Sequence, residues 1–494
     1  MNPQNNAPLE NYLSQGTVEL RNFINNKYIS GNKLELDRVT RYFLFWNFYE
    51  GNHYKDFNDS MLSFNYVKAF IDKVNIFLLG ESCFSFKVNS YYNDVIEEEL
   101  ERSVEKLMLY TWRKNRYHVL MHEVLQMGSI CGDAWVGLGW DADEKVTKMT
   151  LFDSRQCFPT FKDGDITKLE SFTTRVPLET NDKGYVLHVT EYTKTQINSW
   201  KQKNSAEIVG DKDKFNLTTS EHQLDTIPVV HFKNRPNSSS YYGKSDANDI
   251  LKINKIYNEM HQEVKSIIDY YATPTTIVTG ANIKNLKRGL GNVWSGLPPE
   301  ANVYNLGLDV DLSATTAFLD KLKLAMHEIS DVPENVLGKT QAISGTSAAA
   351  LKLTYQPLVQ QADMKSLTYG EGVIAINSLI LKFIGVYNKN NKIYKEIPRD
   401  FLEEYYVEPI WSYGFPTDRM QLLQEAQYEL QMKVASKREI MNKLGKNNVV
   451  DLAEEIRREL IEEAEIQKEI SEITGQQEPK VEPIIEEDPI EEVE

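Results

Sequence analysis

Residues 333–353 read PENVLGKTQAISGTSAAALKL and include Gly338-Lys339-Thr340, the last three residues of a phosphate-binding loop. Such a loop needs G-x-x-x-x-G-K-[ST] directly after a buried strand, so that backbone N–H groups at a helix N-terminus surround the phosphates. Pro333 stands where the first glycine is required, and it has no N–H and a fixed φ. The pattern therefore predicts a polar loop and argues against a nucleotide site.

The sequence on each side of this loop predicts a helix. Upstream, FLDKLKLAMHEIS has apolar residues at helical spacing and no run of β-branched residues. Downstream, Thr346 or Ser347 can cap a helix that the following alanines extend well. We expect helices over 313–330 and from about 347 to 385, and a kink in the second at Pro357, where a backbone hydrogen bond is lost.

A third long helix is predicted to begin near Asp246 and to end at Pro274. Its apolar residues recur at about 3.5-residue spacing. They are Ile250, Ile253, Tyr257, Met260, Val264, Ile267 and Tyr271. Ile250, Leu251, Ile256 and Ile268 spread the apolar surface beyond the main stripe, more widely than one intramolecular partner needs. We therefore expect the helix to make contacts on two sides.

The rest of the chain divides by periodicity. Residues 8–132 have mostly helical spacing. From Asp133 to 234, apolar and polar residues alternate within short segments, and the turn signals DADE, KDGD and NDKG separate these segments. This pattern predicts an antiparallel meander. Short strands and turns are expected over 274–311, and a strand within EYYVEPIWSYGF. Helices resume at Thr417, and the acidic, Pro-containing tail from Ser471 is expected to be disordered.

Composition limits the function classes. The 494 residues carry a formal net charge of −17, whereas proteins that bind DNA tightly by neutralising phosphates are usually basic. DNA can nevertheless pass an acidic protein without sticking to it. Cys83, Cys131 and Cys157 form no disulfide or zinc pattern, which fits a reducing cytoplasm. The first residues lack signal-peptide features, and the longest apolar stretch, around VIAINSLILKFIGV, is too short to span a bilayer, so we expect a soluble intracellular protein.

No pattern predicts catalysis, a metal or a cofactor. His118 and His122 lie four residues apart but have no third ligand in register. DADEK and DGD lack the glutamate of a calcium loop and are expected to be hairpin turns. G-x-S-x-G and catalytic Cys/His signatures are missing from the sequence. We therefore expect a protein that is not an enzyme.

The order of these elements, taken with their residues, resembles the portal proteins of tailed bacteriophages, in the branch typical of long-tailed phages. NFYEGNHY (47–54) and VKAFIDKVNIFLLGE (67–81) resemble the N-terminal helices of that family. IPVVHFKNRP followed by GKSDANDILKINKIYNEM resembles its passage into the first stem helix. ISDVPENVLGKTQAISGTSAAALKLTYQPL resembles its tunnel-loop region.

The resemblance implies an α+β, mostly helical portal fold and a cyclic homo-oligomer, usually of twelve subunits. It implies a wing over 1–244 that is completed by 347–416, where the kinked long helix and a returning strand lie. The other implied parts are stem helices at 245–272 and 312–330, a small α/β clip at 273–311, a tunnel-loop region at 331–346, a helical crown at 417–470 and the disordered tail at 471–494.

The resemblance also implies interaction partners and a location in the virion. The ring would lie at one capsid vertex of the virion after assembly in the host cytoplasm, and double-stranded DNA would pass through it without sequence specificity during packaging and ejection. A separate terminase would drive the DNA. The implied partners are other copies of the chain, the terminase large subunit, a head completion or connector protein, and the major capsid and scaffolding proteins, with no membrane and no cofactor.

The implied functional residues fall into three groups. In the tunnel loop, at about 336–346, the glycines would give freedom and Lys339 would face DNA; the group is Gly338, Lys339, Thr340, Gln341, Ser344 and Gly345. The stem group for oligomerisation is Ile250, Ile253, Ile256, Tyr257, Met260, Val264 and Ile267. The clip group for terminase or connector docking is Lys284, Lys287, Arg288 and Trp294. Any one of these lysines is also explained as a solvated surface charge. In a ring, however, each subunit carries a copy of the same lysine, and a narrow channel would place these copies within a few Debye lengths of each other, about 8 Å each at physiological salt.

Two alternatives remain open. The first is a DNA-stimulated nucleotide hydrolase of the packaging motor, which would rest on Gly338-Lys339-Thr340 and would lose ATP turnover on Lys339→Ala. The second is another capsid-associated structural or scaffolding protein. That protein would form shells or stay elongated, and it would not bind a terminase through residues 273–311.

Overall fold

The computed structural model describes residues 33–474 with gaps. The gaps are 53–61, 81–82, 93–95, 163–164, 166–167, 180–184, 204–213, 239, 273–274, 281–297, 307–311, 339–347, 399, 415–418, 438–439, 442–443 and 445–448. The chain divides into two compact units, Met1–Phe415 and Pro416–Glu494. The described residues form helices and antiparallel sheets, so the predicted α+β class is confirmed.

The first unit begins with helices at the predicted places. They are α3 (Lys33–Tyr49), α4 (Tyr66–Leu79), α5 (Glu98–Lys114) and α6 (Tyr117–Cys131). The Asn65 side chain caps α4 by accepting a hydrogen bond from the Lys68 N–H. Gly80 ends α4 with a φ of 53°, and a Cβ there would lie 1.9 Å from the carbonyl oxygen of Ser412. Only glycine allows this close approach, so Gly80 is the helix stop that the sequence predicted.

Strand β1 (Phe84–Ser90) lies within residues 8–132, which were predicted to be mostly helical, and the sequence did not predict it. It pairs antiparallel with β12 (Tyr405–Trp411), and Val88 lies opposite Val407. Phe84, Phe86 and Val88 are buried and alternate with more exposed residues. The pairing joins segments more than three hundred residues apart, so local periodicity had no information about it.

The predicted meander is confirmed as antiparallel, but it forms two sheets. Strands β2 (Asp133–Asp141), β3 (Val146–Phe152) and β9 (Val229–Lys233) form one sheet in the order β3-β2-β9. The other sheet has the order β4-β5-β6-β7-β8. Its strands are β4 (Cys157–Phe161), β5 (Leu169–Glu179), β6 (Tyr185–Tyr192), β7 (Gln196–Lys203) and β8 (Lys214–Glu221). The short 3-10 turn η2 (Ser154–Gln156) separates β3 from β4.

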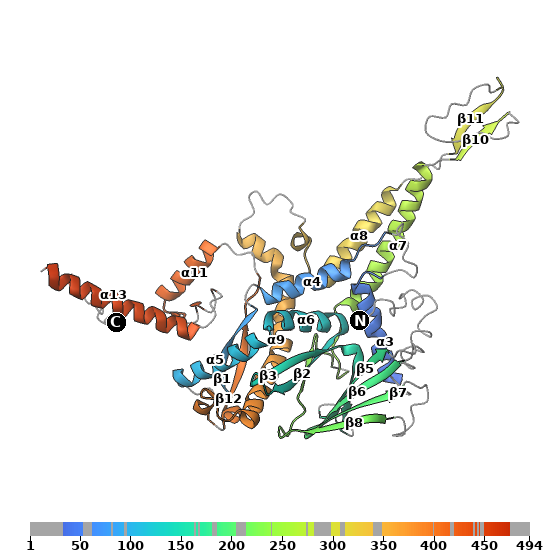
Figure 1. Ribbon diagram of the computed structural model, residues 1–494. Helices are drawn as coiled ribbons and strands as arrows, with labels where there is room; N and C mark the ends of the chain where they lie inside the picture. Colours follow the sequence, from blue (N-terminus) through green and yellow to red (C-terminus); the bar gives the residue numbers. More distant parts are fainter. Residues whose placement is uncertain are drawn as a thin grey trace, which may run out of the picture. The chain divides into compact units, whose positions relative to one another are not determined.

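Two long helices and a hairpin follow the sheets. They are α7 (Ala247–Ala272), β10 (Thr275–Thr279), β11 (Asn302–Leu306) and α8 (Ser313–Ser330). Both helices lie where the sequence predicted them. β10 and β11 pair antiparallel, with Ile277 opposite Tyr304. Figure 1 shows this hairpin at the end of α7 and α8 that is remote from the sheets.

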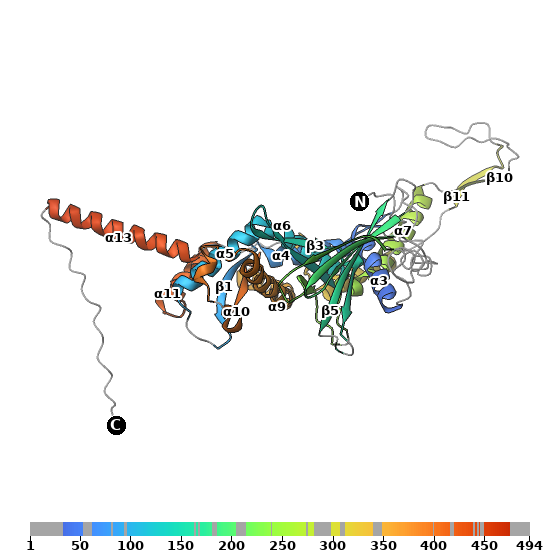
Figure 2. The ribbon, with the colours of Figure 1, turned by 60° about the horizontal axis from the view of Figure 1, so that its bottom comes forward.

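Helix α9 (Ala348–Tyr387) is the core helix of the first unit and contains Pro357. Its inward positions follow helical spacing and are fully buried: Leu358, Ala362, Tyr369, Val373, Ile376 and Ile380. Each large side chain among them contributes roughly 1.5–3 kcal/mol by leaving water. The turns η5 (Tyr394–Glu396) and α10 (Phe401–Glu404) then lead into β12. In both ribbon views α9 lies between the five-stranded sheet and the β1–β12 pair (Figures 1 and 2).

The helix has its predicted length, but its apolar part is longer than the stretch around VIAINSLILKFIGV. Among the described residues, Leu353–Tyr387 is long and apolar enough to cross a membrane by length and composition, so the expectation that the stretch is too short was wrong. It is nevertheless mostly buried, with 61% of its most apolar window inside the structure. Asn377 accepts a hydrogen bond from Trp112 Nε1 at 2.8 Å and donates one to the Val407 carbonyl at 2.9 Å. These contacts identify α9 as the centre of a protein core.

The second unit contains α11 (Arg419–Gln431) and α13 (Val449–Thr474). Between them, the Ile440 N–H bonds the Ser436 carbonyl at 3.1 Å, as in a helical turn. Ser436 and Glu439 have the spacing of a capping box, but Glu439 lies outside the described residues. Because α13 continues to Thr474, residues 471–474 of the expected disordered tail are helical. The remaining tail, 475–494, also lies outside the described residues.

Candidate functional site

The paired helices α7 and α8 divide the predicted oligomerisation residues into two classes. Ile250 and Tyr257 are buried within the chain, 3% and 7% exposed, so they are not available to a second subunit. Ile253, Met260 and Val264 are half-buried and pack on the same intramolecular core. Ile267 is half-buried as well, whereas Ile256 is 44% exposed. Ile268, which lies off the predicted stripe, is 53% exposed.

This distribution corrects the sequence interpretation of the helix. The regular apolar stripe of α7 mainly packs inside its own subunit, because the regular spacing matches the fixed neighbours α4 and α8. Of the apolar residues expected off the main stripe, Ile256 and Ile268 are exposed, whereas Ile250 and Leu251 are buried within the chain. Ile256 is therefore the member of the predicted group that is available for a contact between subunits.

The base of α7 also caps the start of α4. Asn254 Oδ1 accepts hydrogen bonds from the N–H groups of Tyr66 and Val67, at 3.1 and 3.3 Å, and Asn254 Nδ2 donates to the Phe64 carbonyl at 2.7 Å. Asn258 Oδ1 accepts from the Phe64 N–H at 2.9 Å. Both asparagines are fully buried. The first N–H groups of a helix have no intrahelical partner, so α7 satisfies groups that α4 cannot satisfy itself.

Asp246, directly before α7, is the centre of a buried polar cluster that joins α7 to the rest of the first unit. Its carboxylate accepts hydrogen bonds from Lys365 Nζ at 2.5 Å, Arg235 Nε at 2.8 Å and Asn234 Nδ2 at 2.8 Å. Its backbone N–H bonds the Ser129 carbonyl at 2.9 Å. We call this set the stem junction, because the start of α7 is held there by segments from three other parts of the chain.

Lys365, on α9, has no exposed side-chain surface and completes the stem junction. Its Nζ also donates to Ser129 Oγ on α6 at 2.6 Å and lies 3.4 Å from Asn75 Oδ1 on α4. One turn further along α9, the Tyr369 hydroxyl donates to Asn234 Oδ1 at 3.1 Å. A buried ammonium is costly unless it is paired and hydrogen-bonded, and both conditions are met here.

Burial and charge act in opposite directions on the two ionised groups. Burial alone would raise the pKa of Asp246, but Lys365 and Arg235 outweigh it, and the pKa lies below the ordinary value. Burial lowers the pKa of Lys365, and Asp246 offsets part of that effect. The carboxylate is therefore held in its charged form by the two cations around it.

A second buried carboxylate has a structural role. Asp133, at the start of β2, is 0% exposed. It accepts hydrogen bonds from the Tyr42 hydroxyl, from the His231 ring at 2.7 Å and from the Gly243 N–H at 2.8 Å. Burial lowers the pKa of His231, and Asp133 partly opposes this effect. This Tyr–Asp–His set is enclosed, so it orders the chain before α7 and does not face a substrate.

The GKT motif follows helical structure, as the sequence predicted. α8 and the 3-10 turn η4 (Glu334–Leu337) precede Gly338, which has a φ of 93°. The turn is tied to α8, because His327 Nδ1 lies 2.7 Å from the Val332 carbonyl and Lys323 Nζ lies 3.7 Å from Glu334 Oε1. A buried strand does not precede the motif, so the phosphate-binding context is missing.

Several predicted residues lie outside the described part of the chain. These are the tunnel-loop residues Lys339, Thr340, Gln341, Ser344 and Gly345, and the clip residues Lys284, Lys287, Arg288 and Trp294. The described part of the predicted clip is the β10–β11 hairpin, on which Val303 and Tyr304 are 44% and 49% exposed. The roles of both groups stay predictions.

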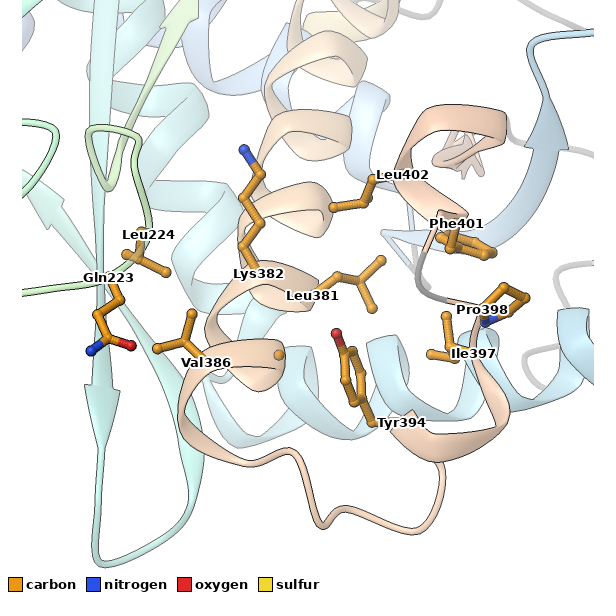
Figure 3. Close-up of a pocket in the computed structure, with 11 residues that line it drawn as sticks. Gln223, Leu224, Leu381, Lys382, Val386, Tyr394, Ile397, Pro398, Phe401 and Leu402 are labelled. Atoms are coloured by element: carbon orange, nitrogen blue, oxygen red, sulfur yellow. The ribbon is translucent and has the colours of Figure 1, made fainter.

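Two surface hollows are large enough to hold a small molecule, but their residues do not form a catalytic or metal site. One, of about 330 Å³, lies between the end of α9 and the η5–α10 segment and is lined mainly by apolar residues. Figure 3 shows its lysine, Lys382, pointing away from Tyr394. The other, of about 400 Å³, is lined by His118, His122 and Cys83 among others. Across the described ranges, no group of three or more His, Cys, Asp or Glu side chains could hold a metal ion. Neither hollow presents a converging acid and base.

Sequence reasoning missed Lys365, Asn254, Asn258 and Asp133. One signal was available for Lys365, since it falls on the inward apolar stripe of α9 between Ala362 and Tyr369. For its partner Asp246, the sequence indicated only a position near the start of a helix. Nothing local in the sequence indicated that these two residues meet.

Comparisons with known proteins identify the family. The family model described as "Phage portal protein, SPP1 Gp6-like" matches residues 26–470. A comparison with curated proteins gives no match. The family match extends from before α3 into α13 and includes the α7–hairpin–α8 segment, the loop after it and the long helix α9. Because it covers nearly the whole chain, the chain belongs to the SPP1 Gp6-like phage portal protein family.

Proposed function

We propose that this chain is the subunit of a ring of about twelve copies that forms the DNA channel at one capsid vertex. Membership of the family implies a structural protein at the portal vertex, assembled as an oligomer with capsid and packaging proteins. The ring would conduct DNA into the capsid during packaging and out of it during ejection. The chain itself would supply no catalysis.

The observation that carries this proposal is the anchoring of α7 and α8. A stem that lines a channel must keep its direction while DNA moves past it. The start of α7 is held by the stem junction, and its next turns are held by the Asn254 and Asn258 contacts to the start of α4. Buried polar contacts of this kind have few alternative arrangements, so they favour one orientation of the stem base.

The charge of the protein also supports a conduit. A surface that bound phosphates tightly would slow a moving duplex, and the chain carries a net charge of −17. Within the ring, Lys339 of the tunnel loop would place one cation per subunit around the DNA. Such a sparse ring of charges would guide the duplex without holding it.

The domain roles follow from the same proposal. The wing would comprise 1–244 and 347–416 and contact the major capsid and scaffolding proteins. The stem would comprise 245–272 and 312–330, the tunnel-loop region 331–346, the crown 417–470 and the acidic tail the residues after it. The clip, 273–311, would bind the terminase large subunit and later a head completion or connector protein, through Lys284, Lys287, Arg288 and Trp294. Assembly would take place in the host cytoplasm.

Electron microscopy of the purified protein, with the mass of the same sample from light scattering, tests the proposal. Rings with an open centre and a mass near a dozen subunits are the expected result. Shells or elongated particles would favour the other capsid-associated structural protein. ATP turnover that disappears in Lys339→Ala would favour the motor subunit, although the helical context before Gly338 argues against it.

A further inference from the structure

We propose that the outer face of the first half of α9 binds a second copy of this chain. We define this outer face as Leu353, Gln356, Pro357, Gln360, Met364 and Leu367, all of which are exposed. The inference rests on the proposed ring and deepens it, because it assigns the contact between subunits to α9 in addition to the stem.

The outer face exposes unusually large aliphatic side chains. Leu353 and Leu367 are 73% and 70% exposed, more than any other aliphatic side chain described in the first unit, and Met364 is 48% exposed. At about 100° of rotation per residue, the three side chains fall within about 60° around the helix axis. They therefore form one apolar stripe along the helix and not scattered surface positions.

The helix cannot turn this stripe into its own core. The opposite side of the same turns is occupied by Leu358, Ala362, Lys365 and Tyr369, which have no exposed surface. Lys365 is bound by the stem junction, and Tyr369 is bonded to Asn234. Rotating α9 to bury Leu367 would break these contacts and expose a buried ion pair. The outer face is accordingly directed away from its own subunit.

Charge distinguishes a second copy from other occupants. Two copies of a chain with a net charge of −17 repel each other, and burying an unpaired carboxylate between them is costly, so an uncharged surface favours their contact. None of the six outer-face residues is charged. The exposed carboxylates nearest to them lie at the edges of the face: Asp363, which accepts a hydrogen bond from the Tyr413 hydroxyl at 2.6 Å, and Glu371. DNA would require cations on this surface, and the outer face has none. An identical acidic chain is the occupant that suits an uncharged apolar stripe.

The outer face lies close in sequence to the proposed tunnel loop, so a contact there would affect the position of that loop. In a ring each subunit contributes two different surfaces, one to each neighbour. The outer face begins a few residues after 336–346, the proposed tunnel loop. A contact between subunits along the first turns of α9 would fix the end of each loop relative to the next subunit. The loops would then keep even spacing around the DNA.

The mass of assembled protein tests the proposal with a matched control. In the double variant Leu353→Asp/Leu367→Asp, two carboxylates lie on the outer face. Leu217→Asp is the control, because Leu217 is 64% exposed but lies on the edge strand β8 of the five-stranded sheet. We expect rings for the wild type and for the control. We expect at least a tenfold lower ring fraction for the double variant, with an unchanged circular dichroism spectrum and melting temperature.

The possible results separate the two proposals. If the wild type forms rings and the double variant forms them equally well, the assignment of the outer face is wrong and the portal function stands. If the wild type forms no rings under any assembly condition, the proposed function fails and this inference fails with it. Loss of rings in the control as well would overturn the assignment, because it would show that any surface carboxylate prevents assembly.

Cross-linking provides a second readout that does not depend on a disruptive change. A photo-reactive amino acid at position 367 is incorporated into a mixture of unlabelled and ¹⁵N-labelled chains that have assembled together. We expect cross-linked peptides that combine one labelled and one unlabelled chain. Cross-links only within one chain, or only to scaffolding protein when that is added, would overturn the proposal.

Discussion

The ammonium group of Lys365 lies 2.5 Å from a carboxylate oxygen of Asp246, although the two residues are 119 positions apart. One belongs to α9 and the other lies directly before α7, so the contact connects the long core helix to the start of α7. Ser129 and Asn75 complete the surroundings of the lysine from two further helices. Helix α7, the proposed stem helix, is therefore anchored by a buried ion pair and not by apolar packing alone.

Lys365→Met tests the strength of this anchor. The variant keeps an unbranched apolar side chain of similar length but leaves Asp246 with Arg235 as its cationic partner. We expect the free energy of unfolding of the first unit to fall by about 3–5 kcal/mol, as for other buried pairs that lose one partner. Urea denaturation measures this change. Lys382→Met, at an exposed position of the same helix, is the control and should change the free energy by less than about 0.5 kcal/mol. Equal effects of the two variants would contradict the anchoring role.

The lowered pKa of Asp246 predicts a dependence of stability on acid. A carboxyl whose folded-state pKa is below its unfolded value contributes stability that is fully present above the unfolded value, near 3.9. That contribution is lost as the pH falls from there through the lower, folded-state pKa. Unfolding measured by denaturant across this acid range should show the loss in the wild type. Asp246→Asn, which cannot titrate, should be less stable at neutral pH and should lack this part of the acid dependence. An unchanged profile would indicate that the cations do not hold the carboxylate charged.

Asn254→Ala should loosen the start of α4. The change removes the acceptor for the Tyr66 and Val67 N–H groups. The Val67 N–H is then buried without this acceptor, at a cost of about 1–3 kcal/mol. Amide hydrogen exchange in the first turn of α4 should become faster, and the melting temperature should fall. Asn248→Ala, at an exposed position of α7, is the control. Faster exchange in both variants would mean that the effect comes from α7 itself.

Ile256→Asp should impair ring formation without unfolding the subunit. Ile256 is 44% exposed on α7, so a carboxylate there is tolerated by the separate chain but costs several kcal/mol if a neighbouring subunit covers it. Light scattering gives the ring fraction, and circular dichroism verifies the fold. Ile267→Asp, at a half-buried position, is expected to act in the same direction. Normal rings from both variants would mean that the contact between subunits avoids α7.

Lys339→Glu should leave assembly intact and impair DNA packaging or retention. The change reverses one charge per subunit in the proposed tunnel loop, so the ring would repel the duplex at close range and within the Debye length. A packaging assay with purified rings, scored by DNA protected from nuclease, measures the effect. Lys339→Arg keeps the charge and should package normally. If Lys339→Glu packages as well as the wild type, this lysine has no part in the channel.

The helices of the stem could be predicted because their signals are local. The apolar spacing and the proline at its end predicted a helix from near Asp246 to Pro274, and the structure has α7 at Ala247–Ala272. α8 was expected over 313–330 and lies at Ser313–Ser330. The β1–β12 pair, by contrast, joins strands that are distant in the chain, and the meander divided into two sheets. Local periodicity reports which residues face a core, but it does not report which segment supplies the partner.

For this protein the sequence alone determined the class, the order of the elements and the resemblance to the portal family, because these depend on spacing and residue type along the chain. The tertiary structure decided which apolar residues of α7 are buried in their own subunit and which remain exposed, since Ile250 and Ile256 are equivalent by composition but face different surroundings. It also decided that Lys365 is a buried ion-pair partner, because only the folded chain brings α9 to Asp246. Contacts between distant segments are absent from any local pattern, and these contacts hold α7 in place.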